Sequence, residues 1–130
     1  SQATPFEHRS FGEELELCKR YYQSIGDRSN NHTLPLFDTA AQDATDSTST
    51  FHFFPPMRTT PTLETTGTAA DYKIYTNNTN ITLASVPSFG SGSTQCGFLS
   101  AAVSSGLTAG EVCHVTGNTD PAFVAFTAEL

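Results

Sequence analysis

The apolar residues of this chain come in short runs, and the residues between the runs are turn formers such as Gly, Pro, Asn and Asp. Short runs bounded in this way are typical of β-strands, whereas helices need longer stretches of regular periodicity. Threonine is also abundant, and its β-branched side chain suits a pleated, half-exposed surface. The pattern therefore predicts an all-β fold, an antiparallel β-sandwich or barrel-like sandwich with many turns.

A disordered, low-complexity chain is the alternative that such a composition raises. Ten phenylalanines and four tyrosines argue against it, because disordered segments are poor in aromatic residues. A chain of 130 residues is long enough for one domain with an ordinary core. We therefore expect one folded domain at residues 10–130, preceded by a linker, or the end of an upstream stem, at residues 1–9.

The turn signals place the individual strands. The sequence NNTN at residues 77–80 predicts a hairpin, because asparagine tolerates positive φ. Pro61 puts its segment at a sheet edge or a bulge, and the alternating residues 123–130 predict a closing central strand. Residues 38–50 contain no aromatic residue and no Leu, Ile or Val, which favours a loop or an exposed strand. The predicted strands are residues 20–25, 34–37, 51–54, 57–66, 72–76, 81–86, 98–103, 112–116 and 123–130.

A short helix is predicted at residues 11–18. Ser10 and Glu13 form an S-x-x-E capping box, in which each side chain can satisfy the backbone amide of the other residue. Acidic residues come early in this segment and basic residues late, which suits the helix dipole. The apolar side chains follow the spacing i, i+4 and i+7 and form one stripe, made of Phe11, Leu15 and Cys18.

The formal net charge of −7 disfavours two classes of partner. Nucleic acid requires a basic protein surface, and so does an anionic membrane surface. The chain has no apolar run close to the roughly 18 residues that a membrane-spanning helix needs. We therefore expect no nucleic-acid partner and no membrane insertion.

The three cysteines, Cys18, Cys96 and Cys113, occur in no CxxC motif and in no Cys/His spacing that holds zinc. Free thiols, packed as small apolar groups, are one interpretation, and they suit a protein made in a reducing cytosol. A disulfide between Cys96 and Cys113 is the alternative.

The sequence carries neither a catalytic motif nor a metal-binding motif. It contains no G-x-S-x-G and no H-E-x-x-H. The glutamates within residues 13–16 could be imagined as a glycosidase carboxylate pair, but the start of a helix explains them better. Asp38, Asp43 and Asp46 lack the pattern of an EF-hand loop, so a solvated acidic loop is favoured over a calcium site. We expect no enzyme activity, no cofactor and no metal.

The most densely patterned segment of the chain is ATPFEHRSFGEELELCKRYYQ, at residues 3–23. Three further segments stand out: FPPMRTTPTLETTG at residues 54–67, SSGLTAGEV at 104–112 and AFVAFTAEL at 122–130. Together these segments resemble a C-terminal domain that recurs in tail-fibre and related virion proteins of tailed bacteriophages, many of them marine. The resemblance covers most of the chain and is weakest at residues 29–50 and 85–95.

The resemblance implies a β-sandwich domain that forms a homotrimer, because phage fibres are usually trimeric. It implies synthesis in the cytoplasm of the host bacterium and a place on the virion, where the N-terminal segment joins the domain to other virion proteins. In general shape the expected fold is also similar to the trimeric H-type lectins, which bind sugars between subunits.

Two loops have the composition of a sugar-binding site, in which polar groups surround an aromatic platform. They are YTNNTN at residues 75–80 and GNTD at residues 117–120. Ordinary turn chemistry, in which Asn and Asp bond their own backbone, is the alternative for each loop. The candidate glycan-binding residues are Tyr75, Asn78, Asn80, Asn118 and Asp120.

The aromatic run FHFF at residues 51–54 exceeds what one sheet face can bury. Either both faces are covered, or one side contacts a neighbouring chain. The candidate trimer-interface residues are Tyr22, Phe53 and Arg58, with the core and the free surface as the alternatives. The leading expectation is a non-enzymatic trimeric fibre domain that binds a host-surface glycan. The alternatives are a trimerisation cap or capsid decoration without sugar binding, and an accessory to an upstream depolymerase.

Overall fold

The computed structural model of the chain describes residues 10–25, 35–119 and 122–129. In these residues one helix, α1 (Phe11–Lys19), precedes the strands, and a 3₁₀ turn, η2 (Ala69–Asp71), leads into the fifth of them. The strands are β1 (Tyr22–Ile25), β2 (Pro35–Ala41), β3 (Asp46–His52), β4 (Thr62–Thr65), β5 (Tyr72–Thr76), β6 (Thr79–Thr82), β7 (Ser88–Gly90), β8 (Cys96–Ala102), β9 (Val112–Gly117) and β10 (Val124–Thr127).

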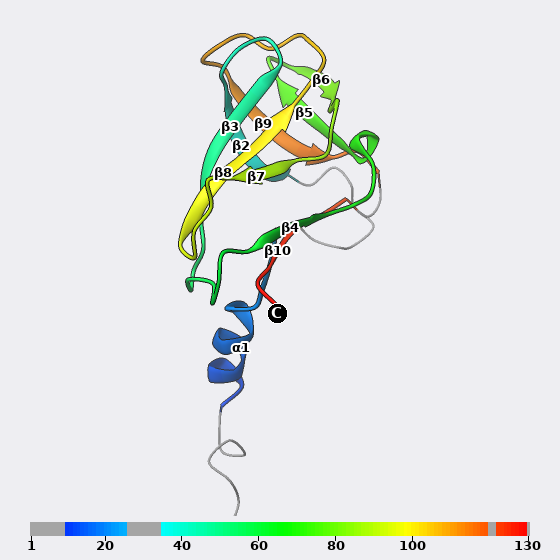
Figure 1. Cartoon of the computed structure of the whole chain (residues 1–130). Helices are drawn as coiled ribbons and strands as arrows, with labels where there is room; N and C mark the ends of the chain where they lie inside the picture. Colours follow the sequence, from blue (N-terminus) through cyan, green and yellow to red (C-terminus); the bar gives the residue numbers. More distant parts are fainter. Residues whose placement is uncertain (1–9, 26–34, 120–121, 130) are drawn as a thin grey trace, which may run out of the picture.

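The strands form two antiparallel sheets that pack as a sandwich (Figure 1). The larger sheet has the order β6-β5-β9-β2-β3-β8-β7, and the smaller has the order β1-β10-β4. The all-β antiparallel sandwich with a short N-terminal helix that the sequence predicts is therefore confirmed. The smaller sheet also confirms two strand positions, since β10 is central and β4, which directly follows Pro61, lies at an edge.

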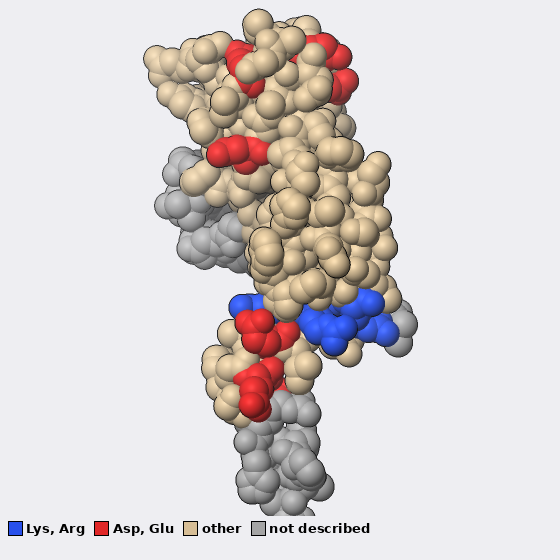
Figure 2. Space-filling model, turned by 90° about the vertical axis from the view of Figure 1, so that its left-hand side faces the viewer, with Lys and Arg blue, Asp and Glu red and all other residues tan. Residues whose placement is uncertain are grey.

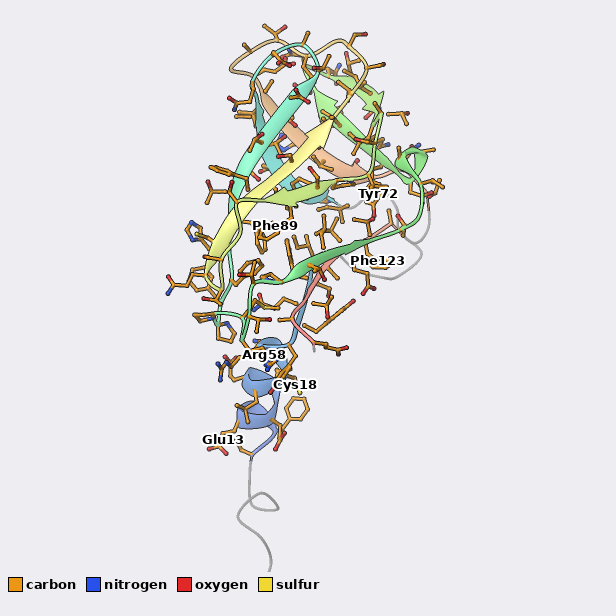
Figure 3. The ribbon with its side chains drawn as sticks, viewed as in Figure 1. Glu13, Cys18, Arg58, Tyr72, Phe89 and Phe123 are labelled. Atoms are coloured by element: carbon orange, nitrogen blue, oxygen red, sulfur yellow. The ribbon has the colours of Figure 1, made fainter. Side chains whose placement is uncertain are left out.

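Aromatic rings fill the space between the two sheets. The ring centroid of Phe126, on β10, lies 5.1 Å from that of Phe51, 4.8 Å from that of Phe53 and 5.1 Å from that of Phe89. Phe126 and Phe53 are buried, and Figure 3 shows Phe89 pointing into this space. A Cβ atom at Gly97 would lie 2.4 Å from the Phe89 ring, so the aromatic core depends on a residue without a side chain at that position.

Tyr72, at the start of β5, joins the two sheets (Figure 3). Its side chain is fully buried, and its hydroxyl donates to the carbonyl oxygen of Phe123, just before β10. The same hydroxyl accepts hydrogen bonds from Thr66, just after β4, at 2.9 Å from the backbone nitrogen and 2.8 Å from Oγ1. One phenol thus ties the larger sheet to two strands of the smaller one.

Helix α1 begins as predicted and ends one residue later than predicted. The Ser10 hydroxyl accepts from the Glu13 amide at 3.1 Å, and the Glu13 carboxylate accepts from the Ser10 amide at 3.2 Å, which completes the capping box. The helix projects away from the sandwich, and none of its residues is buried (Figures 1 and 3). At nine residues it is shorter than the ~12–15 that an isolated helix needs to be stable in water.

The β5–β6 hairpin is confirmed, with corrected bounds. Asn77 and Asn78 form its two-residue loop with φ of 47° and 60°, the positive values that a tight hairpin turn requires. Strand β6 therefore starts at Thr79, directly after this loop, rather than at residue 81, and ends at Thr82 rather than at residue 86.

Of the two alternatives for residues 38–50, a loop or an exposed strand, the strand is confirmed except at the turn of residues 42–45, although its inward side chains are buried. These residues form the end of β2 and most of β3, which pair as a hairpin. Their inward side chains are small and polar: the Thr39 hydroxyl donates to the Ser47 hydroxyl, which donates to the carbonyl of Ala101, each at 2.8 Å. This chain of hydrogen bonds buries Thr39 and Ser47 without any large apolar residue.

Strand β7 is a further difference from the prediction. It was not predicted, because it is only three residues long. The predicted linker at residues 1–9 lies outside the described residues. None of the described residues belongs to a helix long and apolar enough to cross a membrane.

Candidate functional site

A row of polar and aromatic side chains crosses the outer face of the larger sheet. In the strand register Tyr75 of β5 is paired with Asn80 of β6 on one side and with His114 of β9 on the other, and His114 is paired with Asp38 of β2. Directly paired residues point to the same face of a sheet, so the four side chains form one line over four strands. The residues next in sequence point inward and form the core.

Tyr75 is the aromatic member of the row, and 40% of its side chain is exposed. Its hydroxyl donates to Oδ1 of Asn78 at 2.8 Å, which holds the ring against the hairpin loop. Its ring centroid lies 6.4 Å from that of His114, with 26° between the ring planes. The ring therefore has a fixed orientation and a face open to solvent.

His114 and Asp38 form the charged end of the row. Nδ1 of His114 lies 2.7 Å from Oδ1 of Asp38, and both side chains remain largely exposed. The carboxylate fixes the orientation of the imidazole next to Tyr75. The pair is open to solvent, and we assign it the role of holding the imidazole in position beside Tyr75.

A second row lies beside the first. Lys73 of β5 is paired with Thr116 of β9, and Thr116 is paired with Pro35 of β2. The two rows line a shallow depression of about 430 Å³, formed by Pro35, Lys73, Tyr75, Asn80, His114 and Thr116. Thr116 is 8% exposed, and its hydroxyl has no hydrogen-bond partner among the described residues.

The loop beside the depression is held rigidly. The side-chain amide of Asn77 donates to the Glu111 carboxylate, in the turn before β9. The other oxygen of that carboxylate accepts from the backbone nitrogen of Thr108 at 2.8 Å. The hairpin loop and the β8–β9 turn are thereby linked, so the side chains of β5 and β6 start from a fixed backbone.

The structure brings together three of the five predicted glycan-binding residues. Tyr75, Asn78 and Asn80 share the β5–β6 hairpin. The Tyr75 hydroxyl donates to Asn78, and Tyr75 is paired with Asn80 in the strand register. Asn118 lies elsewhere, beyond the opposite end of β5, where its side chain donates to the carbonyl of Ala70 at 2.9 Å. Asp120 lies outside the described residues.

The GNTD segment closes a turn against η2. The backbone nitrogen of Asn118 donates to the carbonyl of Asp71 at 2.7 Å, and the Thr119 hydroxyl donates to the Asp71 carboxylate at 2.6 Å. This hydroxyl lowers the pKa of Asp71 below its ordinary value, because it stabilises the ionised carboxylate. Hydrogen bonds to the η2 segment, rather than bonds of Asn118 to its own backbone, account for the described part of this loop.

The three predicted interface residues lie in different environments. Phe53 is 1% exposed within the single chain, so its ring has no surface left for a neighbouring chain. Tyr22 starts β1, is half-buried and pairs with Thr127. The guanidinium of Arg58 donates to the carbonyl of Ala128 at 3.1 Å and lies 5.2 Å from the centre of the Tyr21 ring, so Arg58 binds within its own chain.

The acidic residues have structural roles within the chain. The Asp43 carboxylate accepts from the backbone nitrogens of Thr45 and Asp46, at 2.8 and 2.9 Å, in the β2–β3 turn. These hydrogen bonds, that from Thr45 foremost, lower the pKa of Asp43. The described residues contain no group of three or more metal-ligating side chains.

The three cysteines are free thiols, as the first interpretation predicted. Cys18 is exposed on α1, Cys96 is half-buried on β8, and Cys113 is buried on β9. Burial, together with the charge of Glu111, raises the pKa of the Cys113 thiol and keeps it protonated.

A second depression, of about 320 Å³, lies over β3, β7 and β8. Half of its lining residues are Ser or Thr, and several of these hydroxyls are already used, as in the 3.3 Å contact between Thr48 and Ser100. No aromatic residue lines it. It lacks the platform that Tyr75 gives to the first depression.

Lys73, His114 and Thr116 were not among the residues predicted from the sequence. Alternation within YKIY and VCHVT places Lys73 with Tyr75 on one strand face, and His114 with Thr116 on another. The missing information was that β5 pairs with β9, strands separated by more than 30 residues of sequence.

Among protein-family models, curated proteins and solved structures, none matches this chain.

Proposed function

We propose that this chain is a non-enzymatic sugar-binding domain of a phage fibre, and that it binds a host-surface glycan at the depression over β5, β6 and β9. The observation that carries the proposal is Tyr75, a half-exposed ring fixed by Asn78 at the edge of a shallow depression. An exposed aromatic face packs against the apolar face of a sugar ring, and amide and hydroxyl groups beside it bind the sugar hydroxyls.

The shape of the depression supports weak binding by each copy. It is open and lies on a flat sheet surface, so a bound sugar keeps much of its own surface in water. Several copies on one particle then raise the overall affinity through multivalency. The phage and virion context of the proposal rests on the sequence resemblance.

The experiment is binding of the labelled chain to a bacterial glycan array that includes lipopolysaccharides and capsular polysaccharides. We expect sugar-competed binding that falls by about two- to tenfold in Tyr75→Ala, since an aromatic contact contributes about 0.5–1.5 kcal/mol beyond the area that it buries. The matched control is Phe98→Ala, because Phe98 is also an exposed aromatic residue of the larger sheet but lies on β8. Absence of binding across the array from folded protein contradicts the proposal.

The second candidate function is structural, and helix α1 favours it. Phe11 is 83% exposed, Leu15 is 43% exposed and Cys18 is exposed, so the predicted apolar stripe faces solvent in the single chain. Lys19, Arg20 and Arg58 gather where α1 meets the sandwich (Figure 2). We propose that the stripe packs against α1 of other copies in a homotrimer, and that the segment before it joins the domain to other virion proteins.

This second candidate is tested by the mass of the particle in solution. The double variant Phe11→Ser/Leu15→Ser removes the stripe but no core contact, so we expect a folded monomer where the parent chain is a trimer in light scattering. Glu16→Gln changes another exposed residue of the same helix and serves as the control. A parent chain that is monomeric at high concentration contradicts the structural candidate and leaves the sugar site untouched.

A further inference from the structure

We infer that the depression selects acidic sugars and that Lys73 and Thr116 hold the sugar carboxylate between them. The inference rests on the proposed sugar-binding function and names the class of ligand. It is argued from two polar groups that lie side by side and have no partner of their own among the described residues.

Within the part of the chain that the structure describes, Lys73 lies apart from the other cationic residues. The structure describes four lysines and arginines, and three of them, Lys19, Arg20 and Arg58, lie at the junction with α1. The fourth, Lys73, lines the depression and has no ion-pair or hydrogen-bond partner among the described residues. Asp38, the acidic residue of the neighbouring row, is paired with His114.

Thr116 lies directly opposite Lys73 on the neighbouring strand. Its hydroxyl is buried and lacks a partner among the described residues, a state that costs about 1–3 kcal/mol and is rare in folded proteins. A carboxylate bound beside the two residues can accept one hydrogen bond from the Lys73 ammonium and, once the side chains that cover it shift, one from the Thr116 hydroxyl. Both bonds are charge-assisted and therefore stronger than bonds between neutral groups.

The aromatic platform lies at the right distance for the rest of the sugar. Tyr75 follows Lys73 by two residues on the same face of β5, which is about 7 Å along the strand. A carboxylate at Lys73 therefore directs the sugar ring toward the face of Tyr75. The side-chain amide of Asn80, paired with Tyr75, can then donate to or accept from the ring hydroxyls.

The test compares sugars that differ only in the carboxylate. Methyl glucuronide and methyl glucoside form one such pair, methyl galacturonide and methyl galactoside a second. Each is titrated into ¹⁵N-labelled protein, and the amide shifts of Lys73, Tyr75 and Thr116 are followed. We expect the acidic member of at least one pair to bind at least about tenfold more tightly than its neutral partner.

Two variants assign the preference to the two residues. Lys73→Gln is expected to remove the preference for the acidic sugar, so that the acidic and the neutral member of a pair bind with the same affinity. Thr116→Val keeps the shape of the side chain and removes the hydroxyl, so we expect weaker acidic-sugar binding from a chain that is as stable as the parent or more stable. Lys19→Gln, which removes a lysine at the α1 junction, is the matched control and is expected to change nothing.

The outcomes separate this inference from the proposed function. Equal binding of acidic and neutral sugars overturns the inference and leaves the sugar-binding function standing. Acidic-sugar binding that survives in Lys73→Gln also overturns it. If neither these sugars nor the polysaccharides of the glycan array bind, the proposed function is overturned, and the inference with it.

Discussion

Tyr72 and Tyr75 lie on one strand, three residues apart, and so point to opposite faces of the larger sheet. The hydroxyl of Tyr72 is buried between the sheets, whereas that of Tyr75 is on the surface beside the hairpin loop. The same side chain therefore stabilises the fold at one position and is available to a ligand at the other. The strand pattern alone distinguishes the two positions.

Replacing Tyr72 by phenylalanine leaves the Thr66 amide and the Phe123 carbonyl without their shared partner. We expect the free energy of unfolding to fall by about 1–3 kcal/mol, as for other buried groups that lose a hydrogen bond. Tyr75→Phe is the control, and its effect is expected to stay within about 0.5 kcal/mol because its hydroxyl is exposed. Urea denaturation of both variants gives the comparison, and equal effects would contradict the role assigned to Tyr72.

At this scale the sequence predicts part of the candidate site. Tyr75, Asn78 and Asn80 could be found because they lie close together in one hairpin, whose loop asparagines are themselves a turn signal. Lys73 and Thr116 could not, because their proximity depends on the pairing of two strands distant in sequence. Phe53 was assigned to an interface because local sequence does not tell which face of an aromatic run is covered.

At the scale of single elements, strands rich in large apolar residues were predicted better than strands of small polar ones. Helix α1 and the β5–β6 hairpin carry explicit start and turn signals. The sequence did not distinguish a loop from a strand at residues 38–50, because the inward positions there are Thr39 and Ser47, which are buried through hydrogen bonds rather than through apolar surface. Hydropathy patterns do not detect this kind of burial.

Strand β8 depends on Gly97, which lies under the Phe89 ring. Gly97→Ala places a methyl group within contact distance of that ring and forces the core to rearrange, so we expect a loss of about 1–3 kcal/mol in stability. At Gly67 an added Cβ meets nothing within 4 Å, which makes Gly67→Ala the matched control. Thermal unfolding of the two variants measures the difference, and similar transition temperatures would show that the core adapts to the methyl group.

The β2–β3 turn should depend on pH through Asp43. Because the folded chain lowers the pKa of this carboxyl below 3.8, the turn contributes stability at neutral pH and loses it as the pH falls through the folded-state pKa. We therefore expect Asp43→Ala to be less stable than the parent at pH 6, and the gap to narrow toward pH 3. Denaturant titrations at both pH values test this, and a gap that does not change with pH contradicts it.

At the scale of the whole molecule, α1 and the β5–β6 hairpin lie at opposite ends of the sandwich (Figure 1). The described residues share one hydrophobic core, and the helix contributes no buried residue to it. The general architecture followed from the sequence, but the order of the strands did not, since many orders satisfy the same turn signals. The arrangement separates the element that we propose for assembly from the depression that we propose for sugar binding.

Removing residues 1–19 should leave the sandwich folded. Because no α1 side chain is buried, we expect the urea midpoint and the slope of the unfolding transition to match those of the parent chain measured as a monomer. The stripe variant Phe11→Ser/Leu15→Ser supplies that monomeric reference. A lower midpoint in the shortened chain would show that α1 stabilises the sandwich directly.

The connection between α1 and β1 has a mechanical consequence. All four residues of β1 pair with β10, and Arg58 and Tyr21 bind the carbonyl and the amide of Ala128 at the end of β10. A tensile force applied through α1 therefore loads these hydrogen bonds side by side, in shear, rather than opening them one after another. If the chain is tethered through α1 and held at the depression over β5, β6 and β9, the β1–β10 pairing carries the force that passes between them.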